Sequence, residues 1–245
     1  MLAVSTSVRV SGVRPLFWIG TFGWFGAFAV AMLVATWAVL PALVAAGIDP
    51  LLAWFLVAGP VFAAMLVGSA VALRREGVAL RWQAVAERLR LRPLTRADLR
   101  WIAAGFALTG LGSALLLGLG ELLGFELRLV PVFFTEEPLA RGQLWLLLAW
   151  LPVFVVNILG EELLWRGVLL PRQEQAFGRH GWLANAIGWL SFHICFGPSM
   201  MLFLVPMIFA QAWACQRSGN TSVGVAIHGA INGVGFVVVS LLGSP

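Results

Sequence analysis

Long apolar runs separated by short polar breaks occupy nearly the whole chain. A membrane-spanning helix needs about 20 mostly apolar residues, and runs close to this length recur along the sequence. They predict an all-α fold, a polytopic transmembrane bundle of about seven helices, with six to eight as the bounds. The expected helices lie near residues 16–40, 51–73, 101–120, 144–165, 182–197, 199–216 and 222–242.

Proline, glycine and polar residues separate the expected helices. The clearest breaks are Asp49-Pro50, Gly197-Pro198 and Ser218-Gly219-Asn220. The first run reaches Ala46 across Pro41, where a kink is expected, and 121–134 is a candidate for a short re-entrant piece. Because no hydrophilic stretch is long enough to form a core of its own, residues 1–245 are expected to form one integral membrane domain.

Composition agrees with a membrane protein. The chain is 60% hydrophobic and 11% charged, whereas soluble domains are about 25% charged. The apolar run that begins at Leu16 is longer than the roughly 7–15-residue core of a secretory signal, so it is expected to remain as the first transmembrane helix.

The net charge of +5 comes from arginines that crowd particular loops, since the chain has no lysine. This distribution predicts membrane topology rather than nucleic-acid binding, because basic loops are retained in the cytoplasm. Loop 74–100, the N-terminus with Arg9 and Arg14, and loop 166–181 are expected inside, and loop 121–143, with Glu136, outside. The lipid bilayer is therefore the expected partner, and a multi-pass place in a cell membrane, the bacterial inner membrane, the expected location.

Within the arginine-rich loop, residues 81–92 predict a short amphipathic helix on the inner membrane surface. Trp82 and the leucines of this segment would face the lipid.

The ionisable residues in the apolar helices are the candidates for a functional site. Placing one near the bilayer centre costs roughly 2.5–3.5 kcal/mol or more, so each needs a partner or a function. Glu162 and Arg166 are four residues apart and share a helix face, whereas Glu161 lies about 100° further round. Asn157 shares the face of Glu161 and is placed to orient it. The alternative is a charge cluster at the membrane edge that reaches water.

Two further helices each carry a histidine. His193 is expected near the membrane middle, on one face with Asn185 and Trp189, and His228 lies one turn before Asn232 among small residues. Taken singly, each histidine fits a satisfied core residue or an interhelical hydrogen bond. Taken together with Glu161, they predict a site where the helices carrying them touch.

These residues resemble the CAAX protease and bacteriocin-processing (CPBP) intramembrane peptidases, which include the type II CAAX prenyl endopeptidases. The family pattern is EExxxR, FxxxH and HxxxN on successive helices. Glu161–Arg166 and His228–Asn232 match in full, and His193 matches with Trp189 in place of phenylalanine. The resemblance implies a hydrolase whose catalytic core covers about 144–242.

The resemblance also implies roles for the residues. Glu161 and His193 would activate a water molecule, His228 and Asn232 would stabilise the oxyanion, and Glu162 with Arg166 would support the site. No metal or other cofactor is required in this reading, although Glu161, His193 and His228 are also a possible zinc set. The substrate would be a membrane-associated peptide or protein that enters from the cytoplasmic side.

Two other functions compete with the peptidase. A proton- or ion-coupled transporter would use the same ionisable residues along a polar path across the membrane. The outer halves of these helices are apolar, which disfavours such a path. A non-catalytic membrane scaffold or chaperone would tolerate a conservative substitution of Glu161.

Overall fold

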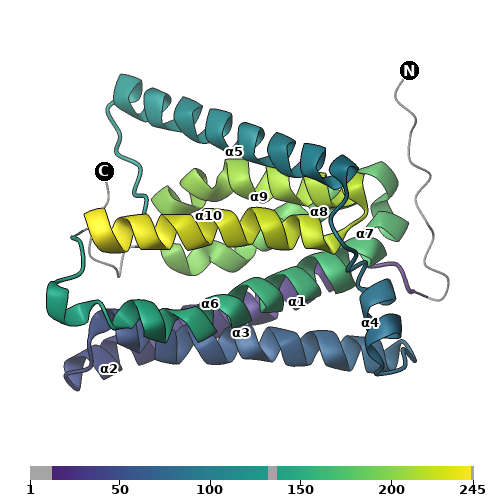
Figure 1. Ribbon diagram of the computed structural model, residues 1–245, viewed down its shortest axis with the longest axis horizontal. Helices are drawn as coiled ribbons and strands as arrows, with labels where there is room; N and C mark the ends of the chain where they lie inside the picture. The colour runs from purple at the N-terminus through teal and green to yellow at the C-terminus, as the bar shows by residue number, and fades with distance from the viewer. Residues whose placement is uncertain (1–12, 132–136, 244–245) are drawn as a thin grey trace.

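The structure, a computed structural model, describes residues 13–131 and 137–243, so Arg9 and Glu136 lie outside the described residues. Every regular element in the described part is helical, which confirms the all-α prediction (Figure 1). The α-helices are α1 (Trp18–Val34), α2 (Leu40–Ala45), α3 (Pro50–Arg75), α4 (Trp82–Arg88), α5 (Arg96–Leu123), α6 (Leu146–Glu161), α7 (Leu170–Phe177), α8 (Gly181–Phe192), α9 (Pro198–Ser218) and α10 (Thr221–Leu242). Short π or 3-10 segments are η1 (Ala35–Val39), η2 (Arg141–Gln143), η3 (Glu162–Leu169), η4 (Gly178–His180) and η5 (His193–Phe196).

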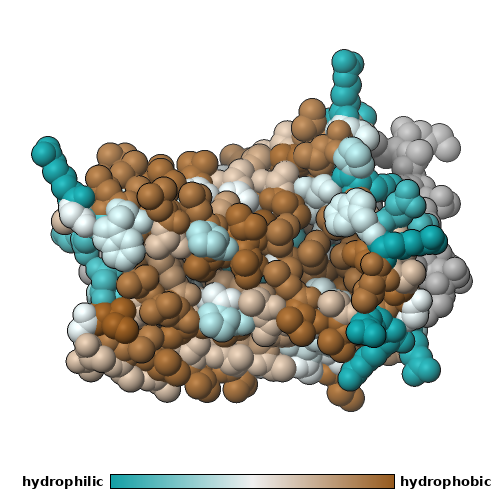
Figure 2. All heavy atoms as spheres, turned by 60° about the horizontal axis from the view of Figure 1, so that its bottom comes forward, coloured by the Kyte–Doolittle hydropathy of each residue, from teal (hydrophilic) through white to brown (hydrophobic). Residues whose placement is uncertain are grey.

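Six helical stretches in the described residues are long and apolar enough to cross a membrane. Two of the seven expected helices, 144–165 and 182–197, fall in one stretch, Leu146–Phe196, because no coil residue separates them. Gly178, the first residue of η4, has φ +58, and α8 then packs back against α7. In the space-filling view a hydrophobic band separates hydrophilic ends (Figure 2). The chain is a multi-pass membrane protein.

The helix boundaries follow from local hydrogen bonds. Asp49 begins α3 by accepting from the backbone N–H groups of Leu51 and Leu52 at 2.9 and 3.2 Å. Thr95 and Asp98 form a reciprocal capping box at the start of α5. Leu40–Ala45 stays helical across Pro41, and the π segment η1 lies just before it.

The helices form layers, with α5 alone on one side in Figure 1. Helices α8, α9 and α10 lie between α5 and a further layer that contains α1, α3 and α6. Glycines permit close packing between these layers: a Cβ on Gly160 of α6 would collide with the Phe62 carbonyl of α3, and one on Gly188 of α8 with the Phe25 ring of α1. This packing brings α6, α8 and α10 together in the interior.

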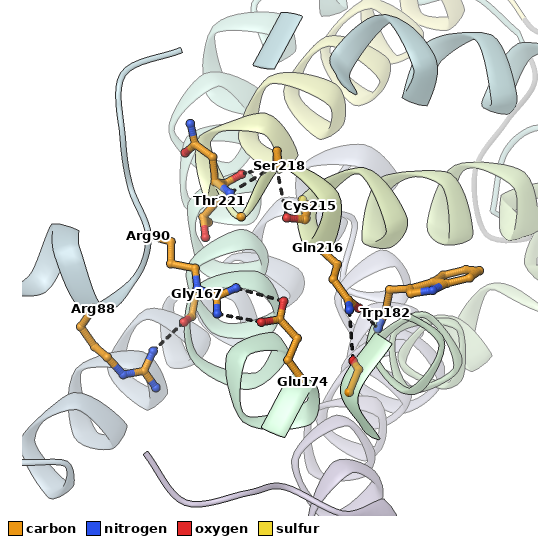
Figure 3. A network of polar contacts seen from close by, with 12 residues as sticks. Arg88, Arg90, Gly167, Glu174, Trp182, Cys215, Gln216, Ser218 and Thr221 are labelled. Carbon is orange, nitrogen blue, oxygen red and sulfur yellow. Dashed lines mark hydrogen bonds and ion pairs between the residues drawn. The ribbon is translucent and has the colours of Figure 1, made fainter. Parts of the chain in front are cut away.

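One end of the bundle, here called the arginine-rich end, gathers the segments α4, α7 and the junction of α9 and α10. Arg88 donates to the Gly167 carbonyl at 2.9 Å, and Arg90 forms a two-point ion pair with Glu174 (Figure 3). Arg92 donates to the carbonyl of Gly219 at 2.8 Å. These bonds tie the 74–100 segment to helices that follow it by many residues.

The amphipathic segment was predicted only in part. Helix α4 lies inside 81–92, and Trp82 is 72% exposed, as expected for a lipid-surface residue. Leu89 is 2% exposed, and its side chain packs so closely against Gly167 that a Cβ on this glycine would collide with it. The leucines of the segment therefore do not all face lipid. Residues 124–131, the described part of the proposed re-entrant piece beyond α5, contain no helix.

The prediction of a loop at 166–181 is wrong. Helix continues from α6 through η3 and α7 to Phe177, and Arg166 is 1% exposed. The sequence placed a membrane edge here because three charged residues lie within six positions. In the structure Glu162 and Arg166 are buried against each other and Glu161 is buried beside Asn157 and Trp189. The helix continues past all three residues.

Candidate active site

Glu161 ends α6, and its carboxylate is held from both sides. Nδ2 of Asn157 donates to Oε1 at 2.7 Å, as the shared helix face predicted. Nε1 of Trp189, on α8, donates to Oε2. The side chain is buried, with 2% of the residue exposed. These two donors, one on the same helix and one on α8, fix the orientation of the carboxylate.

Glu162 opens the π segment η3 and connects it to two other elements, α9 and α10. Oε1 accepts from Nδ1 of His228 at 2.9 Å and from Nε2 of Gln211 at 2.8 Å. Oε2 lies 3.6 Å from Nε of Arg166, which confirms the pairing expected from their spacing. A Cβ on Gly224 would overlap Oε2, so this glycine lets α10 approach the carboxylate. π segments inside α-helices occur often at functional sites.

Arg166 is buried between Glu162 and the indole of Trp189. Its guanidinium carbon lies 3.7 Å from the ring centroid, a cation–π contact. The cation therefore balances the charge of Glu162 in an environment where neither group reaches water.

In both histidines of the site, Nδ1 contacts an oxygen atom of the protein. Nδ1 of His193 lies 2.8 Å from the Trp189 carbonyl, which only accepts, so Nδ1 carries the proton. Nδ1 of His228 faces the Glu162 carboxylate and is protonated for the same reason. In a ring with a single proton Nε2 is then the acceptor, and Nε2 of His228 lies 2.9 Å from Nδ2 of Asn232. A hydrogen bond from His228 Nε2 to an oxyanion requires the doubly protonated ring.

These groups border one cavity of about 510 Å³. Glu161, His193, His228 and Asn232 all contribute to its wall. Most of the remaining wall is apolar and aromatic, and includes Trp54, Phe55, Trp150, Phe154, Phe203 and Phe236.

The cavity extends away from the arginine-rich end. Asp49, Glu137 and Gln143 line its other end, near the starts of α3 and α6, where Gln143 donates to Asp49 at 2.8 Å. Toward the arginine-rich end the interior is filled by Leu164, Trp165 and other fully buried residues of η3. The described lining therefore opens toward one end of the bundle.

Residues 143–234 match the family model for type II CAAX prenyl endopeptidase Rce1-like proteins. The matched region, which is less than half of the chain, is similar to an Rce1-like domain, and this similarity supports the CAAX protease family. No curated protein and no solved structure matches the chain. The family supports a CAAX-type peptide hydrolase of the membrane in general terms, and the match covers every site residue from Glu161 to Asn232.

The matched region brings the sequence motifs together. Glu161, His193, His228 and Asn232 come from α6, the α8–η5 junction and α10, and they border the same cavity. Their catalytic roles remain predictions, because position alone does not test them.

The donor set does not match a three-ligand metal site. Among the described residues, no three histidine, cysteine, aspartate or glutamate side chains gather in a way that could hold a metal ion. Both oxygens of Glu161 already accept hydrogen bonds, and Nε2 of His228 faces the Asn232 amide. Glu161, His193 and His228 therefore do not fit the zinc alternative in this arrangement.

Sequence reasoning missed Gln211. It lies on α9, is fully buried, and shares Glu162 Oε1 with His228. Its only signal was an amide inside an apolar helix, which also fits an ordinary interhelical hydrogen bond. The donor function of Trp189 was missed as well, because the spacing showed a shared face but not what the indole would contact.

Proposed function

We propose that this chain is an intramembrane endopeptidase that hydrolyses a peptide bond of a membrane-associated peptide or protein. The main support is that a carboxylate, two imidazoles and an amide from separate helices border one apolar cavity. An apolar pocket with a few convergent polar groups is typical of a substrate site. These groups are also of the kind that activate water and stabilise an oxyanion.

In the proposed reaction, a water molecule between Glu161 and Nε2 of His193 attacks the scissile carbonyl carbon. Its proton passes to the Glu161 carboxylate as the carbonyl oxygen becomes an oxyanion. The amide of Asn232 donates to that oxyanion, and so does Nε2 of His228 once that ring carries a second proton taken up from solvent before the reaction and kept throughout it. When the carbon–nitrogen bond breaks, the proton on Glu161 passes to the leaving amine, which releases one carboxyl and one amino terminus.

Glu162 has a part in this scheme beyond its pairing with Arg166. Its bond to Nδ1 of His228 fixes the orientation of that ring, so that Nε2 lies on the side of Asn232. Gln211 fixes the same carboxylate oxygen from α9. The supporting residues thus act on His228 rather than on the substrate.

We further propose a bacterial cell membrane as the location, with the arginine-rich end in the cytoplasm. In that orientation the cavity end at Asp49 faces the outer side. This proposal replaces the expected cytoplasmic entry of substrate. Thr109 and Ser113 of α5 line the cavity opposite α10, and α5 diverges from α10 away from the arginine-rich end (Figure 1). A lipid-anchored substrate would therefore approach between α5 and α10.

The cavity shape also bears on the transporter alternative. A transport path must connect both membrane faces, whereas the described lining contains no residue of the arginine-rich end. Glu161, His193 and His228 lie at the closed end of the cavity, which suits a site that receives a peptide and releases products by the same opening.

The function is tested by cleavage of a library of membrane-tethered reporter peptides with the purified, full-length protein in proteoliposomes. We expect discrete fragments, and an unchanged rate after treatment with a zinc chelator, because the described histidine, cysteine, aspartate and glutamate side chains form no group of three that could hold a metal ion. A rate abolished by chelation and restored by zinc would contradict the metal-free mechanism. Absence of fragments across the library would contradict the peptidase proposal.

The access route is tested by Gly235→Trp. Gly235 lines the cavity on α10, and a Cβ there would meet no atom within 4 Å, so the indole can enter open space without disturbing the packing. We expect KM to rise about tenfold with a small change in kcat, since the substrate route narrows while the reacting groups stay in place.

Gly118→Trp is the matched control, because Gly118 is exposed on α5, has equal space around its Cβ and does not line the cavity. Equal kinetic effects of the two substitutions would contradict the access route.

A further inference from the structure

Trp189 is the residue that contacts most of the site without bordering the cavity. It is fully buried on α8 and lies outside the cavity wall. Its indole N–H donates to Glu161, and its backbone carbonyl accepts from Nδ1 of His193. The ring carries the guanidinium of Arg166 on one face. The ring of His228 lies 5.3 Å away, edge to face.

We propose that Trp189 is a positioning residue that holds the Glu161 carboxylate in its reactive orientation through the indole N–H. The inference rests on the proposed function. Trp189 acts through Glu161 and His193, since it does not border the space where a substrate would lie.

The donor, rather than the bulk of the ring, carries this role. Asn157 holds Oε1 of Glu161 from the same helix, so without a second donor the carboxylate is free to turn about that one contact. Trp189 fixes Oε2 from a different helix and thereby sets the plane of the carboxylate relative to His193. A hydrogen bond to a charged group in a low-dielectric interior is stronger than one between neutral groups.

Phenylalanine at this position fills most of the same space but has no N–H group. The CPBP pattern usually has phenylalanine here, so the second donor to Glu161 is a feature of this sequence. The chain therefore has the spacing of the motif and, in addition, a hydrogen bond from Trp189 that restrains Glu161, the proposed general base.

The kinetic test compares Trp189→Phe with replacement of Trp189 by 3-benzothienylalanine, an indole isostere in which sulfur replaces N–H. Both are expected to lower kcat about tenfold to a hundredfold, with KM changed less than about twofold. Trp182→Phe is the matched control on α8, since its ring packs against Phe209 away from the cavity. Unchanged kcat in the benzothienyl protein would overturn the donor role, even if Trp189→Phe is impaired by packing.

The contact is also tested without any cleavage assay. In protein labelled with ¹⁵N at the indole nitrogens of its 12 tryptophans, the Trp189 signal is the one that Trp189→Phe removes. We expect its proton resonance at low field, as for a strong hydrogen bond, and an upfield shift in Glu161→Gln. A Trp189 signal that does not respond to Glu161→Gln would overturn the inference. If the Trp189 signal shifts as expected in Glu161→Gln but the wild-type protein cleaves no reporter, the contact is confirmed and the proposed peptidase function is contradicted.

Discussion

Glu161→Gln is expected to lower the cleavage rate at least about a thousandfold while leaving the protein folded. The amide cannot take the proton of the attacking water, and general-base catalysis is worth roughly a hundredfold to ten-thousandfold. The amide also has only one acceptor atom, so it satisfies one of the two donors, Asn157 and Trp189, that now bind the carboxylate. The measurement is kcat/KM on a cleaved reporter, with thermal unfolding in detergent to confirm folding.

Glu137→Gln is the matched control for this prediction. Glu137 lines the same cavity at its distant end and is exposed, so the same chemical change there removes a charge without touching the reacting groups. Its rate is expected to stay within about twofold of the wild type. Cleavage that survives Glu161→Gln would contradict the assignment of Glu161. A cellular function that survives it in a protein with no cleavage would favour the scaffold alternative.

Helical spacing was sufficient to predict several contacts of the site. Asn157 and Glu161, Glu162 and Arg166, and His228 and Asn232 are each four residues apart, and each pair interacts in the structure. Such pairs depend only on the geometry of one helix. The all-helical membrane fold was predictable for a similar reason, because apolar length alone determines which segments can span the bilayer.

Contacts between different helices could not be predicted from the sequence. The bonds from Trp189 to Glu161 and from Gln211 to Glu162 join residues on different helices. No periodicity fixes which face of α8 or α9 turns toward η3. The glycines that permit these approaches, such as Gly224 beside Glu162, were recognisable as small residues, but their partners were not.

The error at 166–181 has the same origin. A charged cluster within an apolar segment fits either the end of a transmembrane helix or a buried network, and only tertiary contacts distinguish these cases. Glu162 and Arg166 are both buried because His228, Gln211 and the face of Trp189 surround them. The charged cluster therefore marks a buried network within a helix that continues to Phe177, rather than the end of that helix.

Arg166→Met is expected to destabilise the protein by about 3–5 kcal/mol, the cost of leaving a buried charge without its partner. Methionine fills much of the same volume, so the loss would come from the uncompensated carboxylate of Glu162 rather than from a cavity. Thermal or denaturant unfolding in detergent measures the effect, and Arg75→Met, at the exposed end of α3, is the control. The double variant Arg166→Met with Glu162→Gln is expected to recover part of the loss, because no unpaired charge remains. Equal stability of Arg166→Met and the wild type would show that Glu162 does not depend on this cation, and would contradict the supporting role proposed for Arg166.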